Sequence, residues 1–368
     1  MSWHEAIIFF APIVTGALSL LASITIIRKV LKSETKFNSP YSRLVSAMSV
    51  YDVIMSLCNM VSSMPIPSEN PDTWGAIGNK ATCTIQGVLL NFSHIALPFY
   101  IFALSIYYFF VIKYSMTDNT FSTKIEPYLH AIPFLFALIT STVLLSTGSF
   151  GVTGLICHIK GDEHFYMLAF SNVPIISIFL GTTCVMFSIT WSVWRQEKKM
   201  DQYRFEMNSN LSLSSGVSRS SSINSTSAQG TTSLRRVKKS RKTLKALKNQ
   251  SLAFFAAFLV SHGPTYVVVF TAATDGDIMT SSYEVITFIA SSLYPLQGVF
   301  NLCAHLDPMI RRIRREKGQI SYYKAFFIAV KTYEIELDKR TANSTPRRVL
   351  ADRSFRRRSR LLATVENV

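Results

Sequence analysis

The sequence predicts an all-α membrane protein built as a seven-transmembrane helix bundle. Of its 368 residues, 48% are hydrophobic and only 16% are charged, and the mean hydropathy is +0.24. A soluble domain usually carries about 25% charged residues. The apolar residues are gathered into long runs, and nearly all Lys and Arg lie between alternate runs. These observations argue against a soluble enzyme and against a disordered chain.

Seven apolar runs are long enough to cross a membrane, since a spanning helix needs about 20 residues for a hydrocarbon layer about 30 Å thick. The second, fourth and seventh runs are rich in Ser, Thr and Asn, which hydrogen bonds between neighbouring helices can satisfy. Together the runs make a predicted bundle over residues 1–306. The expected spans are residues 5–27, 44–64, 83–112, 127–147, 166–194, 249–273 and 284–306.

Charge predicts the orientation of these spans. The segments after spans one, three, five and seven hold 36 of the 38 Lys and Arg residues, and only Lys80 and Lys160 lie on the other side. Because Lys and Arg near span ends stay in the cytoplasm, we expect an external N-terminus and a cytoplasmic C-terminus, with the protein in the plasma membrane. The net charge of +16 then reflects topology and attraction to membrane lipid, and no nucleic-acid partner is expected.

The third internal loop, residues 195–248, is expected to be partly disordered. Its residues 209–233 include 11 Ser and 3 Thr, a composition that cannot bury a core. The segment is either a solvated linker or a kinase substrate, in which case kinases and arrestin-like proteins are partners. Leu and Val spaced among Lys and Arg over 234–251 predict an amphipathic helix that leads into span six.

The chain after span seven is expected to begin with a surface helix. Asp307-Pro308 is typical of a helix N-cap followed by Pro at the first position. Arg residues then alternate with Met and Ile, which predicts a cytoplasmic amphipathic helix over 307–318 along the membrane. A basic cytoplasmic tail, 319–368, follows, and its apolar run 322–330 is too short to span and is expected to be interfacial.

Two cysteines are expected to form a disulfide. Cys83 opens span three at its outer end, and Cys157 lies in the external loop after span four. Both would face an oxidising compartment, where thiols tend to pair. The other three cysteines lie within spans, where a small apolar side chain is the ordinary interpretation.

These features together resemble a G-protein-coupled receptor. In span seven, Tyr294-Pro295-Leu296-Gln297-Gly298-Val299-Phe300-Asn301 is similar to the cyclic-AMP-receptor-like branch, and its Gln-Gly pair is similar to secretin-type receptors. The chain departs from rhodopsin-type receptors at the inner end of span three, which reads Val111-Ile112-Lys113-Tyr114 in place of Asp/Glu-Arg-Tyr. The resemblance implies a receptor, not an enzyme, that passes an external signal to a cytoplasmic heterotrimeric G-protein.

Ionisable groups at membrane depth are costly and often mark functional sites. Asp52 is similar in position to the span-two Asp of rhodopsin-type receptors, which implies a central polar network or a sodium site; an Asp simply paired to Ser or Asn across the bundle is the open alternative. Other residues of spans two, six and seven join the expected network or act as switch and kink points. The full set is Asp52, Asn59, Pro264, Pro295, Gln297, Gly298 and Asn301.

A ligand region is expected between the outer halves of spans three, five, six and seven. His94 and His262 would bound a cavity that opens outward, since ligand sites in bundles combine an apolar lining with a few polar groups. Helix-packing polarity is the open alternative for each member. The candidates for the unknown external ligand are Gln86, Asn91, His94, Asn172, His262, Tyr266, Tyr283, Glu284, Thr287 and Ser291.

The expected surface for the G-protein lies at the cytoplasmic ends of the spans. Its candidate residues are Arg43, Lys113, Tyr114, Lys242, Lys245 and Arg311. Two other functions remain open, although a carrier or channel lacks a series of charged residues along a path and a zinc hydrolase would need more His ligands than the spans supply. A retinal pump is largely excluded, because it would need a Lys in the middle of a span. We expect no cofactor and no metal.

Overall fold

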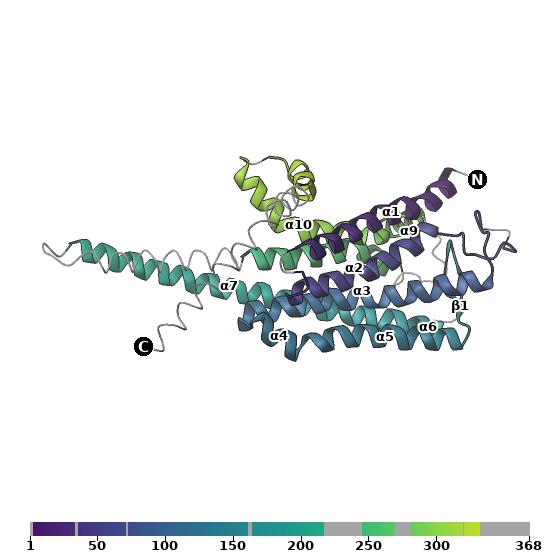
Figure 1. Ribbon diagram of the computed structural model, residues 1–368, viewed down its shortest axis with the longest axis horizontal. Coiled ribbons are helices and arrows are strands. Elements are labelled where there is room, and N and C mark those ends of the chain that lie inside the picture. Colours follow the sequence, from purple (N-terminus) through teal and green to yellow (C-terminus); the bar gives the residue numbers. More distant parts are fainter. Residues whose placement is uncertain are drawn as a thin grey trace, which may run out of the picture. The chain divides into compact units, whose positions relative to one another are not determined.

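The computed structural model is a bundle of long helices with a small β-hairpin (Figure 1). It describes residues 3–33, 36–70, 73–160, 164–216, 245–268, 281–318 and 320–331. The chain divides into two compact units, Met1–His305 and Leu306–Val368, and each is described by itself. The first unit contains the bundle and the hairpin.

Seven helical segments in the described part of the chain are long and apolar enough to cross a membrane, as the sequence predicts. The protein is therefore a multi-pass integral membrane protein with seven spans. Spans one to four are the helices α1 (Trp3–Lys32), α2 (Pro40–Val61), α3 (Lys80–Tyr114) and α5 (Glu126–Ser146). Spans five to seven are α6 (His164–Met167) with η1 (Leu168–Asn172) and α7 (Val173–Gly216), the unlabelled helix Lys245–Val268, and α9 (Ser281–Leu293) with η2 (Tyr294–Leu296) and α10 (Gln297–Glu316).

Helix α3 is the centre of the bundle, because it packs against α2, α5, α7 and the hairpin. Its start is well defined: the side chain of Asn79 accepts from the backbone N–H of Thr82, and the Thr82 hydroxyl accepts from the backbone N–H of Asn79. This reciprocal cap satisfies two N–H groups that a helix start leaves unpaired. Side chains with a central position in the fold therefore come largely from α3.

The hairpin consists of β1 (Phe150–Thr153) and β2 (Ile156–Ile159), which pair antiparallel. Gly154 has φ +63° at the two-residue turn, a conformation that Gly adopts without strain. The predicted disulfide between Cys83 and Cys157 is present and fastens β2 to the start of α3. The side-chain oxygen of Gln86 also accepts from the backbone N–H of Cys157 at 3.0 Å. Below, "hairpin end" means this end of the bundle.

The opposite end carries α4 (Asp118–Lys124), a short helix that the sequence analysis did not predict. The Thr117 side chain caps its start, and Phe121 is fully buried. This end is called the α4 end below.

Two expectations about helix ends are corrected. Residues 209–216, expected to be disordered, belong to α7; Ser lowers helix propensity by only about half a kcal/mol and does not forbid a helix. The rest of the Ser-rich segment and residues 234–244 lie outside the described residues. No helix begins at Asp307-Pro308, because α10 continues through Pro308, and the Asp307 carboxylate instead accepts from Nε of Arg311 at 2.8 Å.

Two prolines within the spans lie at or next to irregular turns. The π-helical turn η1 ends two residues before Pro174, and the 3₁₀ turn η2 contains Pro295. Proline removes a backbone donor and disturbs the α-helical ladder, which accounts for both.

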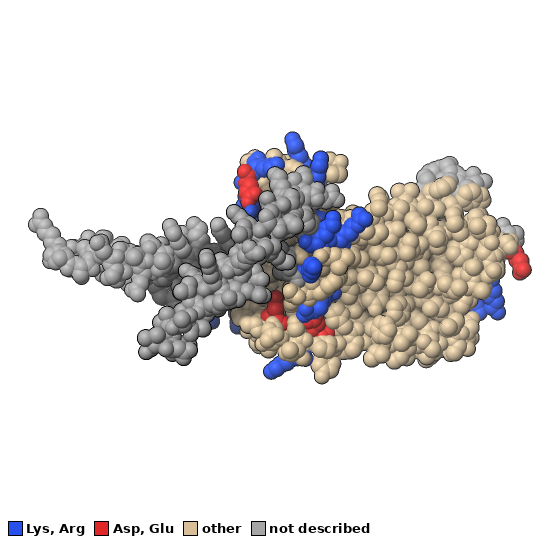
Figure 2. Space-filling view, viewed as in Figure 1, with Lys and Arg blue, Asp and Glu red and all other residues tan. Residues whose placement is uncertain are grey.

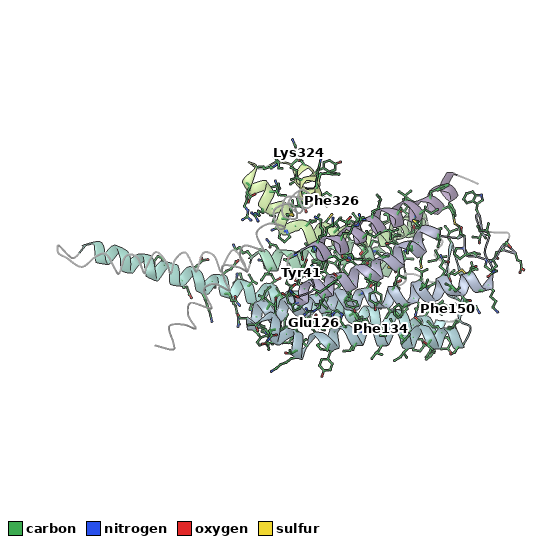
Figure 3. The ribbon with its side chains drawn as sticks, in the orientation of Figure 1. Tyr41, Glu126, Phe134, Phe150, Lys324 and Phe326 are labelled. Carbon is green, nitrogen blue, oxygen red and sulfur yellow. A yellow bond between two sulfur atoms is a disulfide. The ribbon has the colours of Figure 1, made fainter. Side chains whose placement is uncertain are left out.

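The bundle surface matches a lipid environment. Large apolar side chains such as Leu21, Ile139 and Phe187 are more than half exposed. The face drawn in Figure 2 shows a broad band without charged side chains, and the sticks of Figure 3 show Phe134 on the outside of α5. Such an exposed apolar surface is expected where lipid replaces water.

Candidate functional site

Rings from three spans meet toward the hairpin end. The hydroxyl of Tyr294, in η2, hydrogen-bonds to Nδ1 of His94, on α3. The ring of His262, on the helix Lys245–Val268, lies 5.3 Å from that of Tyr294 between centroids. The structure therefore brings the two histidines singled out from the sequence to one tyrosine.

Two further rings extend this group. The ring of His158, on β2, lies 5.8 Å from that of His94, and the ring of Tyr266 lies 6.1 Å from that of His262. We call His94, His158, His262, Tyr266 and Tyr294 the His–Tyr cluster. It joins α3, the hairpin and spans six and seven.

The cluster holds polar atoms that other side chains leave unused. His262 is only 1% exposed, and its Nδ1 pairs with the hydroxyl of Ser261 at 2.9 Å. Its Nε2 and the hydroxyl of Tyr266 have no hydrogen-bond partner among the described residues. Buried polar atoms without a partner are uncommon and costly. The hydrogen-bonding capacity of both atoms is thus unused by the described residues.

The hairpin contributes a neutral histidine to the cluster. Burial lowers the pKa of His158 from 6.5 to about 4, because desolvation disfavours the charged imidazolium. His158 is therefore uncharged at neutral pH. It offers one donor and one acceptor nitrogen rather than a positive charge.

Two other predicted ligand residues connect helices instead of lying in the cluster. The side-chain amide of Gln86 donates to the carbonyls of Cys58 and Ser62, and its oxygen accepts from the Cys157 N–H. The amide of Asn91 donates to the hydroxyl of Ser141, on α5, at 3.0 Å. Both residues are buried between elements.

The remaining predicted ligand residues are spread around the hairpin end. Asn172 is half-buried at the end of η1, Thr287 is exposed, and the Ser291 hydroxyl donates to the carbonyl of Phe288 within α9. The side chains of Tyr283 and Glu284 lie outside the described residues.

A second polar group lies in the middle of the bundle. The side-chain amide of Asn301, on α10, donates to Oδ2 of Asp52, on α2, at 2.8 Å. The Asp52 carboxylate is thus paired across the bundle, and both residues are buried. Gln297 is also buried, and neither of its side-chain polar atoms has a partner among the described residues. Asn59 bonds within α2, to the carbonyl of Met55.

Gly298 allows α10 to approach α1 closely. Its backbone N–H donates to the hydroxyl of Ser19 at 2.9 Å. A Cβ at this position would lie 2.4 Å from Oγ of Ser23 and 2.8 Å from the backbone oxygen of Ser19. Small residues at helix contacts in membranes allow such approach. Of the other expected network residues, Pro264 is half-buried and Pro295 is buried within η2.

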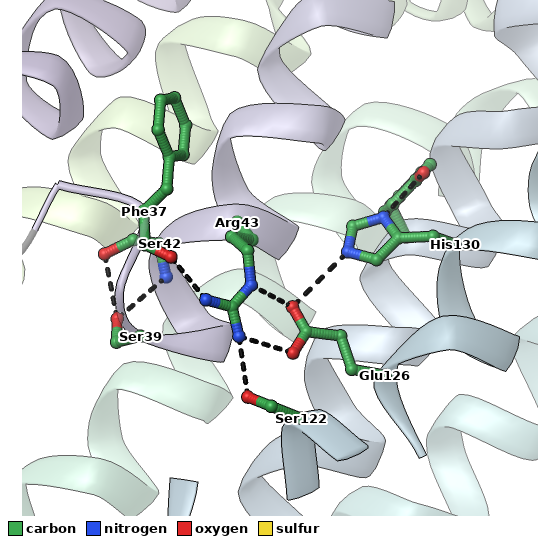
Figure 4. A network of polar contacts seen from close by, with 8 residues as sticks. Phe37, Ser39, Ser42, Arg43, Ser122, Glu126 and His130 are labelled. Carbon is green, nitrogen blue, oxygen red and sulfur yellow. Dashed lines mark hydrogen bonds and ion pairs between the residues drawn. The ribbon is translucent and has the colours of Figure 1, made fainter. Parts of the chain in front are cut away.

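At the α4 end, Arg43 is held in a polar network (Figure 4). Its Nε and Nη2 donate to the two carboxylate oxygens of Glu126 at 2.5 and 2.6 Å. Nη2 also donates to the hydroxyl of Ser122 at 2.6 Å, and Nη1 donates to the carbonyl of Phe37. His130 Nε2 lies 3.6 Å from Oε1 of Glu126. Arg43 thus ties the start of α2 to α4 and α5.

A second polar contact at the α4 end joins spans two, six and seven. The hydroxyl of Tyr41 accepts from the amide of Gln250 at 2.8 Å and pairs with Nδ1 of His305 at 2.9 Å. The rings of Tyr41 and His305 are stacked, with centroids 5.9 Å apart. We call these three residues the Tyr41 bridge.

The other predicted coupling residues have different surroundings. Nζ of Lys113 lies over the rings of Phe109 and Tyr114, and Tyr114 is 58% exposed. Nζ of Lys245 lies 3.5 Å from a carboxylate oxygen of Glu197, on α7. Arg311 is exposed and paired with Asp307, and Lys242 lies outside the described residues.

Three functional candidates are not predicted from the sequence: His158, Glu126 and Tyr41. A signal for His158 was present, because apolar residues alternate on both sides of a Gly-Leu turn, which is typical of a hairpin. No local pattern pairs Arg43 with Glu126, since 83 residues separate them.

Within the described ranges, no group of three or more His, Cys, Asp or Glu residues is arranged to hold a metal ion.

Comparison with known proteins identifies the fold alone. No protein-family model matches the chain, and no curated protein matches it. Among solved structures, the crystal structure of squid rhodopsin matches with a TM-score of 0.60 at 13% sequence identity, over 90% of this chain and 95% of that one. The chain thus has a rhodopsin-like, GPCR-like seven-helix fold. This likeness lends no support to the cyclic-AMP-receptor-like branch.

Proposed function

We propose that this protein is a G-protein-coupled receptor that binds an external ligand at the His–Tyr cluster and activates a cytoplasmic heterotrimeric G-protein. The proposal includes an external N-terminus, with the hairpin end outside the cell and the α4 end in the cytosol. The distribution of Lys and Arg supports this orientation, because positive residues near span ends are retained in the cytoplasm.

One observation carries the proposal: spans six and seven are linked at both ends of the bundle, directly at one end and through Tyr41 of span two at the other. Toward the hairpin end, His262 meets Tyr294; at the α4 end, Gln250 and His305 share Tyr41. The 12 residues from Gln250 to His262 correspond to about 18 Å of helix. A ligand that moves His262 relative to Tyr294 would thereby act on the Tyr41 bridge.

The mechanism is a shift between two packings of the bundle. A ligand favours one packing only if it binds that packing more tightly. A molecule that hydrogen-bonds to His262 Nε2 or the Tyr266 hydroxyl would compete with the present ring contacts. Opening of the Tyr41 bridge would then free the cytoplasmic part of span six, and Lys245 on that span would contact the G-protein together with Lys113 at the end of span three.

The cluster favours an uncharged small molecule with a ring system. Its members are imidazole and phenol groups, and it includes neither a carboxylate nor a Lys or Arg. Such groups offer donors, acceptors and aromatic faces but no partner for an ionic ligand.

The experiment uses the full chain in lipid nanodiscs with a panel of purified G-proteins. A library of neutral aromatic compounds is screened for stimulated nucleotide exchange. We expect H262A and Y266F to reduce the response to an active compound at least tenfold, while S146A, in α5 and outside the cluster, leaves it unchanged. Transport of a compound without any exchange would instead establish a carrier and contradict the proposal.

A further inference from the structure

The second unit contains two helical segments joined by a turn, the helix pair below, which the proposed function does not use. The end of α10 is followed by a turn and by a second helix, residues 322–331. Nε of Arg314 donates to the carbonyl of Ile320 at 2.9 Å, and the hydroxyl of Ser321 accepts from the backbone N–H of Lys324. The turn is therefore held by contacts from both helices.

The helix 322–331 has two different faces. Ala325 and Ala329, one turn apart, are fully buried. Tyr323 and Phe327, also one turn apart, are 73% and 53% exposed, and their rings lie 4.6 Å apart. Residues three and four apart share one face of a helix, so Lys331 continues this exposed face. Two aromatic rings and a lysine thus point outward together.

Lysines border the aromatic rings. Lys324 and Lys331 are exposed, and Figure 3 shows the Lys324 side chain directed away from the helix pair. Aromatic residues beside Lys are typical of helices that lie in a membrane interface, where the rings enter the acyl boundary and the lysines reach the headgroups.

The helix pair as a whole is strongly positive. Residues 307–331 include seven Lys and Arg but only two acidic residues. Both acids are already paired within α10, Asp307 with Arg311 and Glu316 with Arg312. An excess of cations beside exposed rings complements an anionic lipid surface, which attracts nearby Lys and Arg residues.

Chain connectivity places a bilayer within reach. The second helix follows the last span after the five residues 317–321, which cover at most about 18 Å. The bilayer that holds α10 is therefore the nearest surface available to the exposed rings.

We propose that the face formed by Tyr323, Lys324, Phe327 and Lys331 docks onto anionic phospholipid of the same membrane. Tyr323 and Phe327 enter the headgroup region, and the two lysines bind lipid phosphate and carboxylate groups. This proposal goes beyond signalling and requires neither an external ligand nor a G-protein.

The test measures the depth of a tryptophan in full-length protein. Phe327→Trp is prepared in nanodiscs of phosphatidylcholine alone or mixed with phosphatidylserine, with or without brominated acyl chains that quench tryptophan on contact. The signal of the unchanged chain, which has 4 Trp, is subtracted. We expect strong quenching at position 327 with phosphatidylserine and several-fold weaker quenching without it.

Charge variants identify the headgroup interaction. In the F327W background, K324Q/K331Q should reduce quenching several-fold in phosphatidylserine discs. The matched variant K113Q/K124Q, which removes two charges elsewhere, should leave it unchanged. Quenching that is absent, or equal in both lipids, would overturn the proposal. Quenching that appears only after deletion of residues 332–368 would also overturn it, because the chain's own tail would then cover this face.

Discussion

Arg43 and Glu126 form a bidentate ion pair, with both carboxylate oxygens within 2.6 Å of guanidinium nitrogens. The Glu126 side chain is 6% exposed and that of Arg43 is 30% exposed. The pair therefore positions α2, α4 and α5 from a largely buried location. Arg43, which the sequence analysis assigned to the G-protein surface, is engaged by the bundle itself.

Breaking this pair should destabilise the protein. Removing one partner of a buried pair leaves the other charge without compensation, so we expect R43Q and E126Q each to lower the free energy of unfolding by about 2 kcal/mol. Thermal unfolding in detergent measures the loss. Glu316→Gln, which breaks an exposed pair with Arg312, serves as control and should cost less than about 0.5 kcal/mol. Additive losses in the double variant would contradict a direct pairing.

The Tyr41 bridge should restrain basal signalling. A hydrogen bond contributes about 1 kcal/mol, so loss of the Gln250 contact in Q250A, or of both contacts in Y41F, should raise ligand-free nucleotide exchange about 2- to 10-fold. Exchange on purified G-protein measures the effect. Tyr107→Phe removes a nearby hydroxyl that bonds to Asp118 instead, and should have no effect. Unchanged exchange in both bridge variants would refute this role.

The contact between α1 and α10 should not accept a larger residue at position 298. In G298A the new methyl group would overlap Oγ of Ser23 and the backbone oxygen of Ser19, and overpacking typically costs about 1–3 kcal/mol. Addition of S23A should recover part of the loss, because the backbone oxygen remains in place. Gly263→Ala is the matched control, since a Cβ there meets no atom within 4 Å. Equal stability of both alanine variants would show that the helices are not in close contact.

The hairpin should lose stability in acid through His158. Its pKa is about 4 in the folded protein and near 6.5 when unfolded, so between these pH values the unfolded chain binds more protons. Stability should therefore fall as pH decreases from about 6.5 to about 4, by at most about 3 kcal/mol from this group.

Unfolding of H158Q and the unchanged protein across this range measures the contribution. The difference in stability between the two should decrease toward acid and stay constant above pH about 7, where neither state protonates the imidazole. A difference that does not depend on pH would show that His158 is not buried as a neutral side chain.

Sequence alone determined the seven spans and the Cys83–Cys157 pairing. A spanning helix forms its backbone hydrogen bonds within itself, so a span can be recognised from the length and apolar composition of one continuous segment. The two cysteines could be paired because topology placed both on one side. Tertiary structure alone decided that Glu126 pairs with Arg43, that β2 carries His158 to His94, and that Tyr41 lies between Gln250 and His305. These contacts join residues far apart in the chain, and helix periodicity does not specify which neighbouring helix a polar side chain will face.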